Sequence, residues 1–233
     1  MTGPEPRPQT NWDGRVAGNF IGGGTGTGLL MLGGLAAQFS GTPMMAFVIP
    51  AQVLIIAGLL LVWHEIGRPW RFLHVVFNVR TSWMTREAIM APPLLVVAGQ
   101  AIIFDAPLFC IIPTLFAFAF LFCQSRMLTA AKGIPAWREP MAGPLIIITG
   151  LTEGAGLLLV IVLITSGDVQ WLVTLLLVLV SFSLAVWSVY RRRLAAGGAP
   201  TETLKSVAGI GRWLVPLGFA LPIVAGITSL VLG

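Results

Sequence analysis

Seven runs of mostly apolar residues, each long enough for a membrane helix, occupy most of this 233-residue chain. A helix needs about 20 such residues to cross the bilayer core, and a lone segment in lipid must satisfy its own backbone polar groups. Only 10% of the residues are charged, against roughly 25% in an average soluble domain. The sequence therefore predicts an all-α integral membrane protein, a bundle of about seven transmembrane helices.

The predicted spans follow a polar N-terminal tail, residues 1–17, and form one transmembrane domain, residues 18–233. They lie at about 18–39, 43–63, 88–105, 107–125, 141–166, 169–190 and 208–232, with an interfacial segment at 64–87. The third and fourth runs are short and are separated only by Asp105-Ala106-Pro107, so an arrangement of eight helices stays open.

All 14 Lys and Arg residues fall in the tail, at the entry to the first span, or in every second linker. These residues are Arg7, Arg15, Arg68, Arg71, Arg80, Arg86, Arg126, Lys132, Arg138, Arg191, Arg192, Arg193, Lys205 and Arg212. The opposite linkers hold only Asp105 and Asp168. The positive-inside rule therefore predicts a bacterial or archaeal inner-membrane protein whose N-terminus and basic linkers are cytoplasmic and whose C-terminus lies outside.

The glycine-rich stretch Gly22–Gly28 is not a phosphate-binding loop, because it lies inside the first predicted span and no strand precedes it. Gly18, Gly22 and Gly26 recur every four residues, as do Gly24 and Gly28. Small residues at this spacing let neighbouring membrane helices approach closely. We interpret the stretch as a helix-packing surface.

The boundary between the second and third spans carries the best candidates for chemistry. His64 and Glu87 both lie on the basic side and can approach each other there. Histidine exchanges protons near neutral pH, and a carboxyl group at a low-dielectric boundary can be tuned to do the same. A quinone, which takes up two protons with two electrons, needs such a pair. The alternative is ordinary anchoring of Trp, His and Arg at headgroup level.

Glu153 is the one ionisable residue deep inside a predicted span. It lies about 12 residues into the fifth span, which is roughly 18 Å of helix rise. An ionisable group at that depth is a functional candidate by default. Glu153 either relays protons or forms a hydrogen bond with a neighbouring helix.

The chain offers no pattern for a bound metal. Cys110 and Cys123 belong to one predicted helix, roughly 20 Å apart, which is too far for a disulfide. No zinc or iron–sulfur spacing occurs. His64 and His74 lie at one membrane edge rather than on facing helices at matching depth. We therefore expect neither haem nor metal in this chain.

The middle of the chain, about residues 50–157, resembles the membrane-anchor subunits of the dimethyl sulfoxide reductase family. The run His64–Arg71 looks like the histidine-containing segment of that family, and Ser82–Ile89 resembles its following helix entry with a glutamate. Gln124–Met127 with Gly133–Trp137 is similar to a later stretch of these anchors. The segment 131–140 looks most like the anchors of phenylacetyl-CoA:acceptor oxidoreductases.

The resemblance implies a membrane-bound complex of three subunits. A catalytic molybdopterin subunit, with molybdenum or tungsten, exchanges electrons with a ferredoxin-like iron–sulfur subunit that holds several clusters and docks on the anchor. The anchor binds a quinone, menaquinone or ubiquinone, and passes electrons between the iron–sulfur subunit and the quinone pool. It would not act on the organic substrate itself.

On this resemblance, His64 and Glu87 match the catalytic residues of the quinone site. The other expected quinone-binding residues are Arg68, Arg86 and Trp83. The expected docking residues are Arg68, Arg71, Arg80, Arg126, Lys132 and Arg138. The chain departs from the family in its seven predicted spans, where better-known anchors have eight, and in its basic His64-to-Glu87 linker. That linker places the soluble partners on the cytoplasmic face.

Two other functions stay open. A secondary transporter or proton channel would use Glu153 as a midplane site, although no repeated half is evident. A purely structural assembly subunit would bind no cofactor. Nucleic acid is not an expected partner, because the basic residues lie in short linkers that face lipid headgroups or a docked protein.

Overall fold

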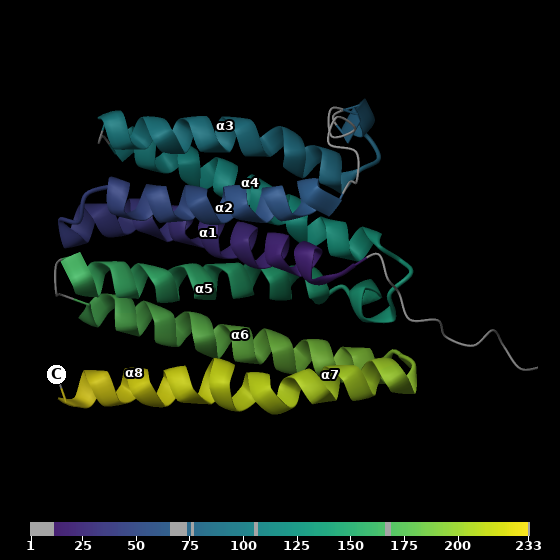
Figure 1. The fold of residues 1–233 in the computed structure, drawn as a ribbon. Coiled ribbons are helices and arrows are strands. Elements are labelled where there is room, and N and C mark those ends of the chain that lie inside the picture. The colour runs from purple at the N-terminus through teal and green to yellow at the C-terminus, as the bar shows by residue number, and fades with distance from the viewer. Residues whose placement is uncertain (1–11, 66–73, 76, 105–106, 166–168, 233) are drawn as a thin grey trace, which may run out of the picture.

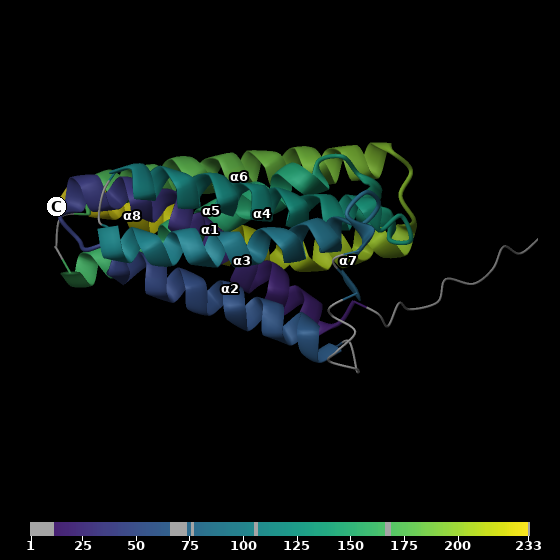
Figure 2. The same cartoon turned by 90° about the horizontal axis from the view of Figure 1, so that it is seen from above.

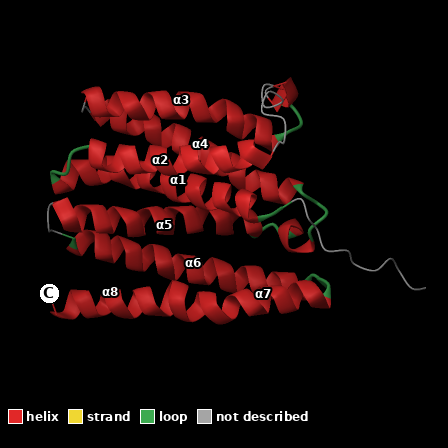
Figure 3. Cartoon of the chain, viewed as in Figure 1, coloured by secondary structure: helices red, strands yellow, loops and turns green. Residues whose placement is uncertain are grey.

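The computed structural model describes residues 12–65, 74–75, 77–104, 107–165 and 169–232, and these residues form helices and turns without a strand (Figure 3). The α-helices are α1 (Gly14–Ser40), α2 (Met45–Glu65), α3 (Trp83–Phe104), α4 (Pro107–Ala130), α5 (Ala142–Thr165), α6 (Gln170–Ala196), α7 (Thr201–Trp213) and α8 (Leu221–Leu232). A π-helical segment, Leu214–Ala220, joins α7 to α8, and a short 3-10 helix spans Pro135–Arg138. Seven stretches are long and apolar enough to cross a membrane, which confirms the predicted all-α membrane bundle.

The helices lie side by side and run back and forth along one axis (Figure 1). The start of α1, the end of α2, the start of α3 and the connections α4–α5 and α6–α7 lie at one end, and the C-terminus lies at the other, in both views (Figures 1 and 2). We call the first end the basic end, because it carries Arg15, Arg86, Arg138 and Arg193 among others. The helices therefore alternate in direction, as the placement of the basic residues in every second linker predicted.

Helix α1 is the central helix of the bundle and packs against α2, α4 and α5. In the most apolar stretch of α1, 61% of the residues are buried inside the bundle. The corresponding share is 6% in the last span, which comprises α7, the π-helical segment and α8. The last span packs mainly on α6 among the other spans of the described chain. Burial thus falls from the centre of the bundle to its edge at α8.

Two glycine faces of α1 explain its central position. A Cβ atom on Gly22 would lie 2.6 Å from the backbone oxygen of Leu54 on α2. On another face, a Cβ on Gly28 would lie 2.1 Å from the backbone oxygen of Gly150 on α5. No larger residue fits at these crossings, so the interpretation of the glycine-rich stretch as a packing surface is confirmed.

Side-chain caps set the first residues of α1 and α3. Asp13 accepts a hydrogen bond from the backbone N–H of Arg15 at 2.8 Å, and the hydrogen bond from the Arg15 guanidinium lowers the pKa of Asp13 below its usual value. The hydroxyl of Ser82 accepts from the backbone N–H of Thr85 at 3.2 Å, which starts α3 at Trp83.

The helix ends differ from the predicted bounds of the interfacial segment, residues 64–87. Helix α3 begins five residues before the predicted position 88, and α2 continues to Glu65, so Glu87 lies within the second turn of a helix. At the same end α6 continues to Ala196 rather than 190. A helix can extend past the end of its apolar run, because its backbone hydrogen bonds between residues i and i−4 do not require apolar side chains.

Two glycines of α5 allow a matched test of the α1–α5 contact. A Cβ on Gly154 would lie 2.3 Å from the backbone carbon of Gly28, whereas a Cβ on Gly156 would meet nothing within 4 Å. We expect Gly154→Ala to destabilise the protein by about 1–3 kcal/mol through overpacking. Gly156→Ala should leave the melting temperature unchanged or slightly raised. Thermal unfolding in detergent measures both, and equal effects would contradict the close crossing.

Candidate functional site

A buried carboxyl group lies where α1, α3 and α4 meet near the basic end. The side chain of Glu87 is on α3, and the residue is only 4% exposed. Its Oε1 accepts hydrogen bonds from Gln124 Nε2 on α4 at 2.9 Å and from Asn19 Nδ2 on α1 at 3.3 Å. Gln124 Nε2 also donates to the backbone oxygen of Asn19 at 3.2 Å. We call Asn19, Glu87 and Gln124 the carboxyl–amide cluster.

Glycines on α1 and α2 make room for this cluster. A Cβ on Gly23 would lie 2.3 Å from Gln124 Nε2, and a Cβ on Gly58 would lie 3.2 Å from Asn19 Oδ1. A side chain at position 23 would displace the Gln124 amide from its place beside Glu87, and one at position 58 would press on both the backbone and the side chain of Asn19. The cluster therefore depends on the same glycine-rich surface that brings the helices together.

Two acceptors of the cluster have no hydrogen-bond partner within the described chain. They are Asn19 Oδ1 and Gln124 Oε1, both buried, while both amide nitrogens donate toward Glu87. Burying a polar atom without a partner costs free energy. The two oxygens are therefore unused acceptors inside the bundle, next to Glu87.

His64 lies apart from this cluster. It is exposed in the last turn of α2, and no hydrogen bond or ion pair joins its described side chain to Glu87. The structure thus pairs Glu87 with two amides rather than with the histidine. A role for His64 in proton exchange stays a prediction.

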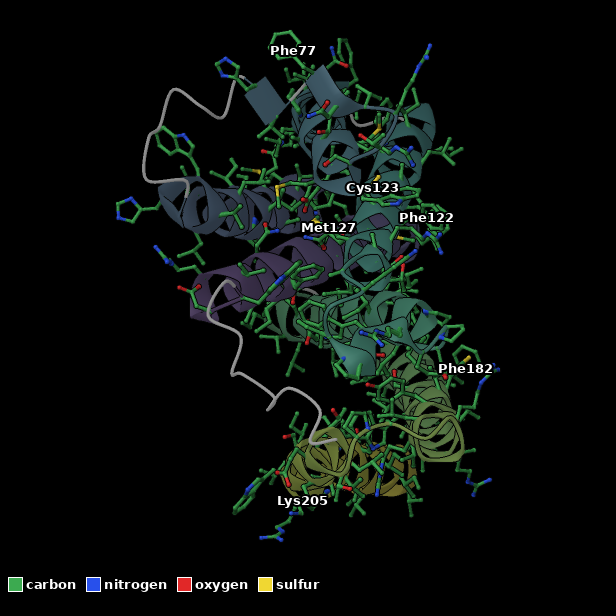
Figure 4. The ribbon with its side chains drawn as sticks, turned by 90° about the vertical axis from the view of Figure 1, so that its right-hand side faces the viewer. Phe77, Phe122, Cys123, Met127, Phe182 and Lys205 are labelled. Carbon is green, nitrogen blue, oxygen red and sulfur yellow. The ribbon has the colours of Figure 1, made fainter. Side chains whose placement is uncertain are left out.

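Three of the predicted residues gather beside the start of α3. The guanidinium of Arg86 lies 4.0 Å and that of Arg126 lies 5.4 Å from the centre of the Trp83 ring. Phe122, labelled in Figure 4, packs against the same ring edge-on, with ring centres 5.8 Å apart. Cation–π contacts of this kind are strongest with Trp. Trp83 is one helical turn before Glu87, so these residues adjoin the carboxyl–amide cluster.

The other predicted docking residues divide into two groups. Arg80, Lys132 and Arg138 are exposed at the basic end, and Arg138 Nε donates to the backbone oxygen of Lys132. Arg68 and Arg71 lie outside the described residues.

A pocket of about 520 Å³ opens beside α3 at the basic end. Its described lining residues are His74, Val75, Asn78, Ser82, Met84 and Thr85. Thr85 is buried, and its hydroxyl donates a hydrogen bond to the backbone oxygen of Val75. The pocket is thus lined by the first turn of α3, and Glu87 follows in the second turn of the same helix. Figure 4, which looks onto the basic end, shows the neighbouring Phe77 at the outer rim of the bundle.

The sequence reasoning passed over several of these residues as candidates. Asn19 and Gln124 are neutral polar residues inside predicted spans, which is itself a signal, since polar groups in lipid need a partner. Thr85 and His74 gave no such signal, because their linker carries many polar residues.

Glu153 has a partner on the neighbouring helix. Its Oε2 accepts a hydrogen bond from the hydroxyl of Thr25 on α1 at 2.6 Å. Of the two roles left open for Glu153, the hydrogen bond between helices is therefore present, and the proton relay stays a prediction. Thr25 is six residues from Asn19, or about 9 Å along α1, so α1 supplies a hydrogen-bonding group to both the buried Glu87 and the partly buried Glu153.

No known protein family, curated protein or solved structure matches this chain in comparisons of sequence and fold. The chemistry of the site is therefore argued from its own residues. Within the described parts of the chain, no three His, Cys, Asp or Glu side chains are placed to share a metal ion. The cluster offers a buried carboxyl group and two amide oxygens without partners in the described chain, and a pocket lies at the first turn of the same helix α3.

A double-mutant cycle tests the bond between Glu87 and Gln124. Glu87→Leu and Gln124→Leu should each lower the free energy of unfolding by about 1–3 kcal/mol, because each leaves a buried polar partner unsatisfied. The double variant should lose less than the sum of the two. Chemical unfolding in detergent gives the coupling energy.

The matched control for this cycle is Gln52→Leu combined with Glu87→Leu. Gln52 Nε2 donates to the backbone oxygen of Leu95 at 2.7 Å and so belongs to a different contact. This pair should be additive within about 0.5 kcal/mol. Additivity of the Glu87 and Gln124 variants as well would contradict the cluster.

Proposed function

We propose that this chain is the quinone-binding membrane anchor of a multisubunit oxidoreductase of the dimethyl sulfoxide reductase type. It would pass electrons between an iron–sulfur subunit and the membrane quinone pool, while a molybdenum or tungsten subunit acts on the substrate. One observation carries the proposal. Glu87 is buried near the basic end and hydrogen-bonded by Gln124 and Asn19, on the helix whose first turn lines the pocket with Met84 and Thr85.

The chemistry of a quinone suits this arrangement. Reducing a quinone to a quinol requires two protons with two electrons, and oxidising it releases them. Glu87 can give or take one of these protons, because a carboxyl group in a suitable environment acts as a general acid or base. Asn19 Oδ1 and Gln124 Oε1 are acceptors that suit the hydroxyl groups of a quinol. His64, exposed at the same end, would exchange protons with the solution.

The charges at the basic end support docking of a soluble partner on the same face. Arg80, Arg126, Lys132 and Arg138 are exposed there, and no ion pair with a carboxylate occupies any of them in the described chain. An acidic surface on the iron–sulfur subunit would match them. The positive-inside rule puts that face, and therefore both soluble subunits, in the cytoplasm.

The decisive test separates quinone coupling from partner activity. His64→Ala and Glu87→Gln should each reduce quinone-linked turnover of the purified complex at least tenfold, because each removes a proton-exchanging group. Turnover with an artificial dye, which takes electrons from the soluble subunits, should remain unchanged. The matched control is Glu202→Gln, since Glu202 is exposed on α7 and forms only a surface ion pair with Lys205.

Three results would contradict the proposal. The first is unchanged quinone turnover in Glu87→Gln. The second is an equal loss of dye and quinone activity, which would indicate an assembly role. The third is purification of the chain alone, without iron–sulfur and molybdopterin subunits, in a form that transports a solute into vesicles.

Glu153 is the observation that favours the transporter or channel as the second candidate, since its bond to Thr25 lies deep in the bundle. In the anchor, Glu153 would relay protons toward the quinone site. Glu153→Gln keeps an acceptor for the Thr25 hydroxyl and removes the exchangeable proton. We expect a severalfold lower quinone turnover with normal assembly and normal dye turnover. Thr25→Val, which removes the hydrogen bond and keeps the carboxyl, is the comparison, and unchanged turnover in Glu153→Gln would exclude the relay.

A further inference from the structure

A second pocket lies at the basic end between α6 and α7, on the opposite side of the bundle from α3 (Figure 1). Its volume is about 580 Å³. The lining residues are Ser188, Arg191, Arg192, Leu194 and Ala195 from α6, and Leu204, Val207 and Ala208 from α7. The polar and cationic groups of the pocket thus all come from α6, and its α7 side is apolar.

The pocket lies at the depth of lipid headgroups. Helix α6 has 27 residues, which is about 40 Å of helix, against about 30 Å for the hydrocarbon core of a bilayer. Arg191 and Arg192 are in the last two turns of α6. The end of α6 that carries them therefore projects beyond the hydrocarbon into the headgroup region.

The two arginines of this pocket differ from their neighbours in having no anionic partner. Arg193 pairs with Glu139 at 2.8 Å, and Lys205 pairs with Glu202 at 2.9 Å. No carboxylate of the described residues pairs with Arg191 or Arg192. Two guanidinium groups that share one pocket without a counter-charge favour an anion, and Arg forms paired hydrogen bonds to phosphate oxygens.

A buried donor lies next to the same pocket. The indole nitrogen Nε1 of Trp187 is buried and has no hydrogen-bond partner in the described chain, although the residue is only 5% exposed. A Cβ built on Gly211 of α7 would lie 3.5 Å from Trp187 Cζ2 and 3.6 Å from Arg191 Nη1. The Trp187 ring and the Arg191 guanidinium therefore both lie at the contact between α6 and α7.

The surface that continues from the pocket along the last span is apolar. Ile210, Trp213 and Leu217 are each more than half exposed. The last span has little protein around it, so these side chains face lipid in a membrane. An occupant with an anionic head at the pocket and an apolar tail along this surface matches both parts.

We propose that the pocket between α6 and α7 binds an anionic phospholipid through its phosphodiester group. Arg191 and Arg192 hold the phosphate oxygens, and the acyl chains lie against the last span. Basic pockets between transmembrane helices recognise headgroups by this chemistry. The site is independent of the proposed quinone function and lies on the other side of the bundle.

The test is native mass spectrometry of the full chain in detergent, titrated with phosphatidylglycerol or with phosphatidylcholine of the same acyl chains. We expect phosphatidylglycerol to bind at least tenfold more tightly than phosphatidylcholine. Arg191→Gln should remove most of this preference. Lys205→Gln is the matched control, because Lys205 is exposed at the outer edge of α7 (Figure 4) and its loss should change affinity less than twofold.

A second variant keeps every charge and fills the pocket. Ala208→Phe should abolish the preference for phosphatidylglycerol, and circular dichroism should show unchanged helix content. Inorganic phosphate at the lipid concentration should not displace the bound lipid, since it lacks the acyl chains. The proposal is overturned by equal losses in Arg191→Gln and Lys205→Gln, by unchanged lipid binding in Ala208→Phe, or by displacement with phosphate alone.

Discussion

Close approach of helix backbones at glycine is the constraint on which the rest of this structure depends. In lipid there is little hydrophobic force between helices, so packing and hydrogen bonds hold a bundle together. Helix α1 presents Gly22 to α2 and Gly28 to α5, at distances that leave no room for a Cβ atom. These contacts make α1 the central helix. The remaining helices are placed relative to it, down to the last span at the edge.

The same close packing determines where polar groups can be buried. A carboxyl group inside a membrane bundle requires hydrogen-bond partners, because unsatisfied polar atoms cost free energy in a low-dielectric medium. Asn19 and Thr25 of α1 supply those partners to Glu87 and Glu153, respectively. Gly23 leaves the space in which Gln124 reaches Glu87. The backbone packing and the candidate site are therefore two consequences of one glycine-rich helix.

Charge divides the basic end into regions with different proposed partners. Beside α3, Arg86 and Arg126 flank Trp83 next to the pocket and the carboxyl–amide cluster, which suits a quinone and a docked redox subunit. Beside α6, Arg191 and Arg192 form a separate cationic pocket next to the lipid-facing last span, which suits an anionic headgroup. The bundle holds these regions apart, so variants in one can be made without touching the other.

The sequence by itself determined the class of the fold and which linkers lie at the same end of the bundle. Apolar length specifies how many segments can cross a bilayer, and the grouping of basic residues specifies which linkers share an end, so both are local properties of the chain. It also singled out Glu87 and Glu153, because a carboxyl group in or beside an apolar run is conspicuous without any partner in view.

Only the tertiary structure decided which side chains those carboxyl groups meet. Glu87 is bound by Asn19 and Gln124, which lie 68 and 37 positions away along the chain, and not by His64. Helix α3 also begins at Trp83 and not at the predicted residue 88. The Ser82 hydroxyl caps the helix there, before the apolar run begins. The spacing of residues along one helix determines which of its side chains share a face. Which faces of different helices meet depends on how all the helices pack together.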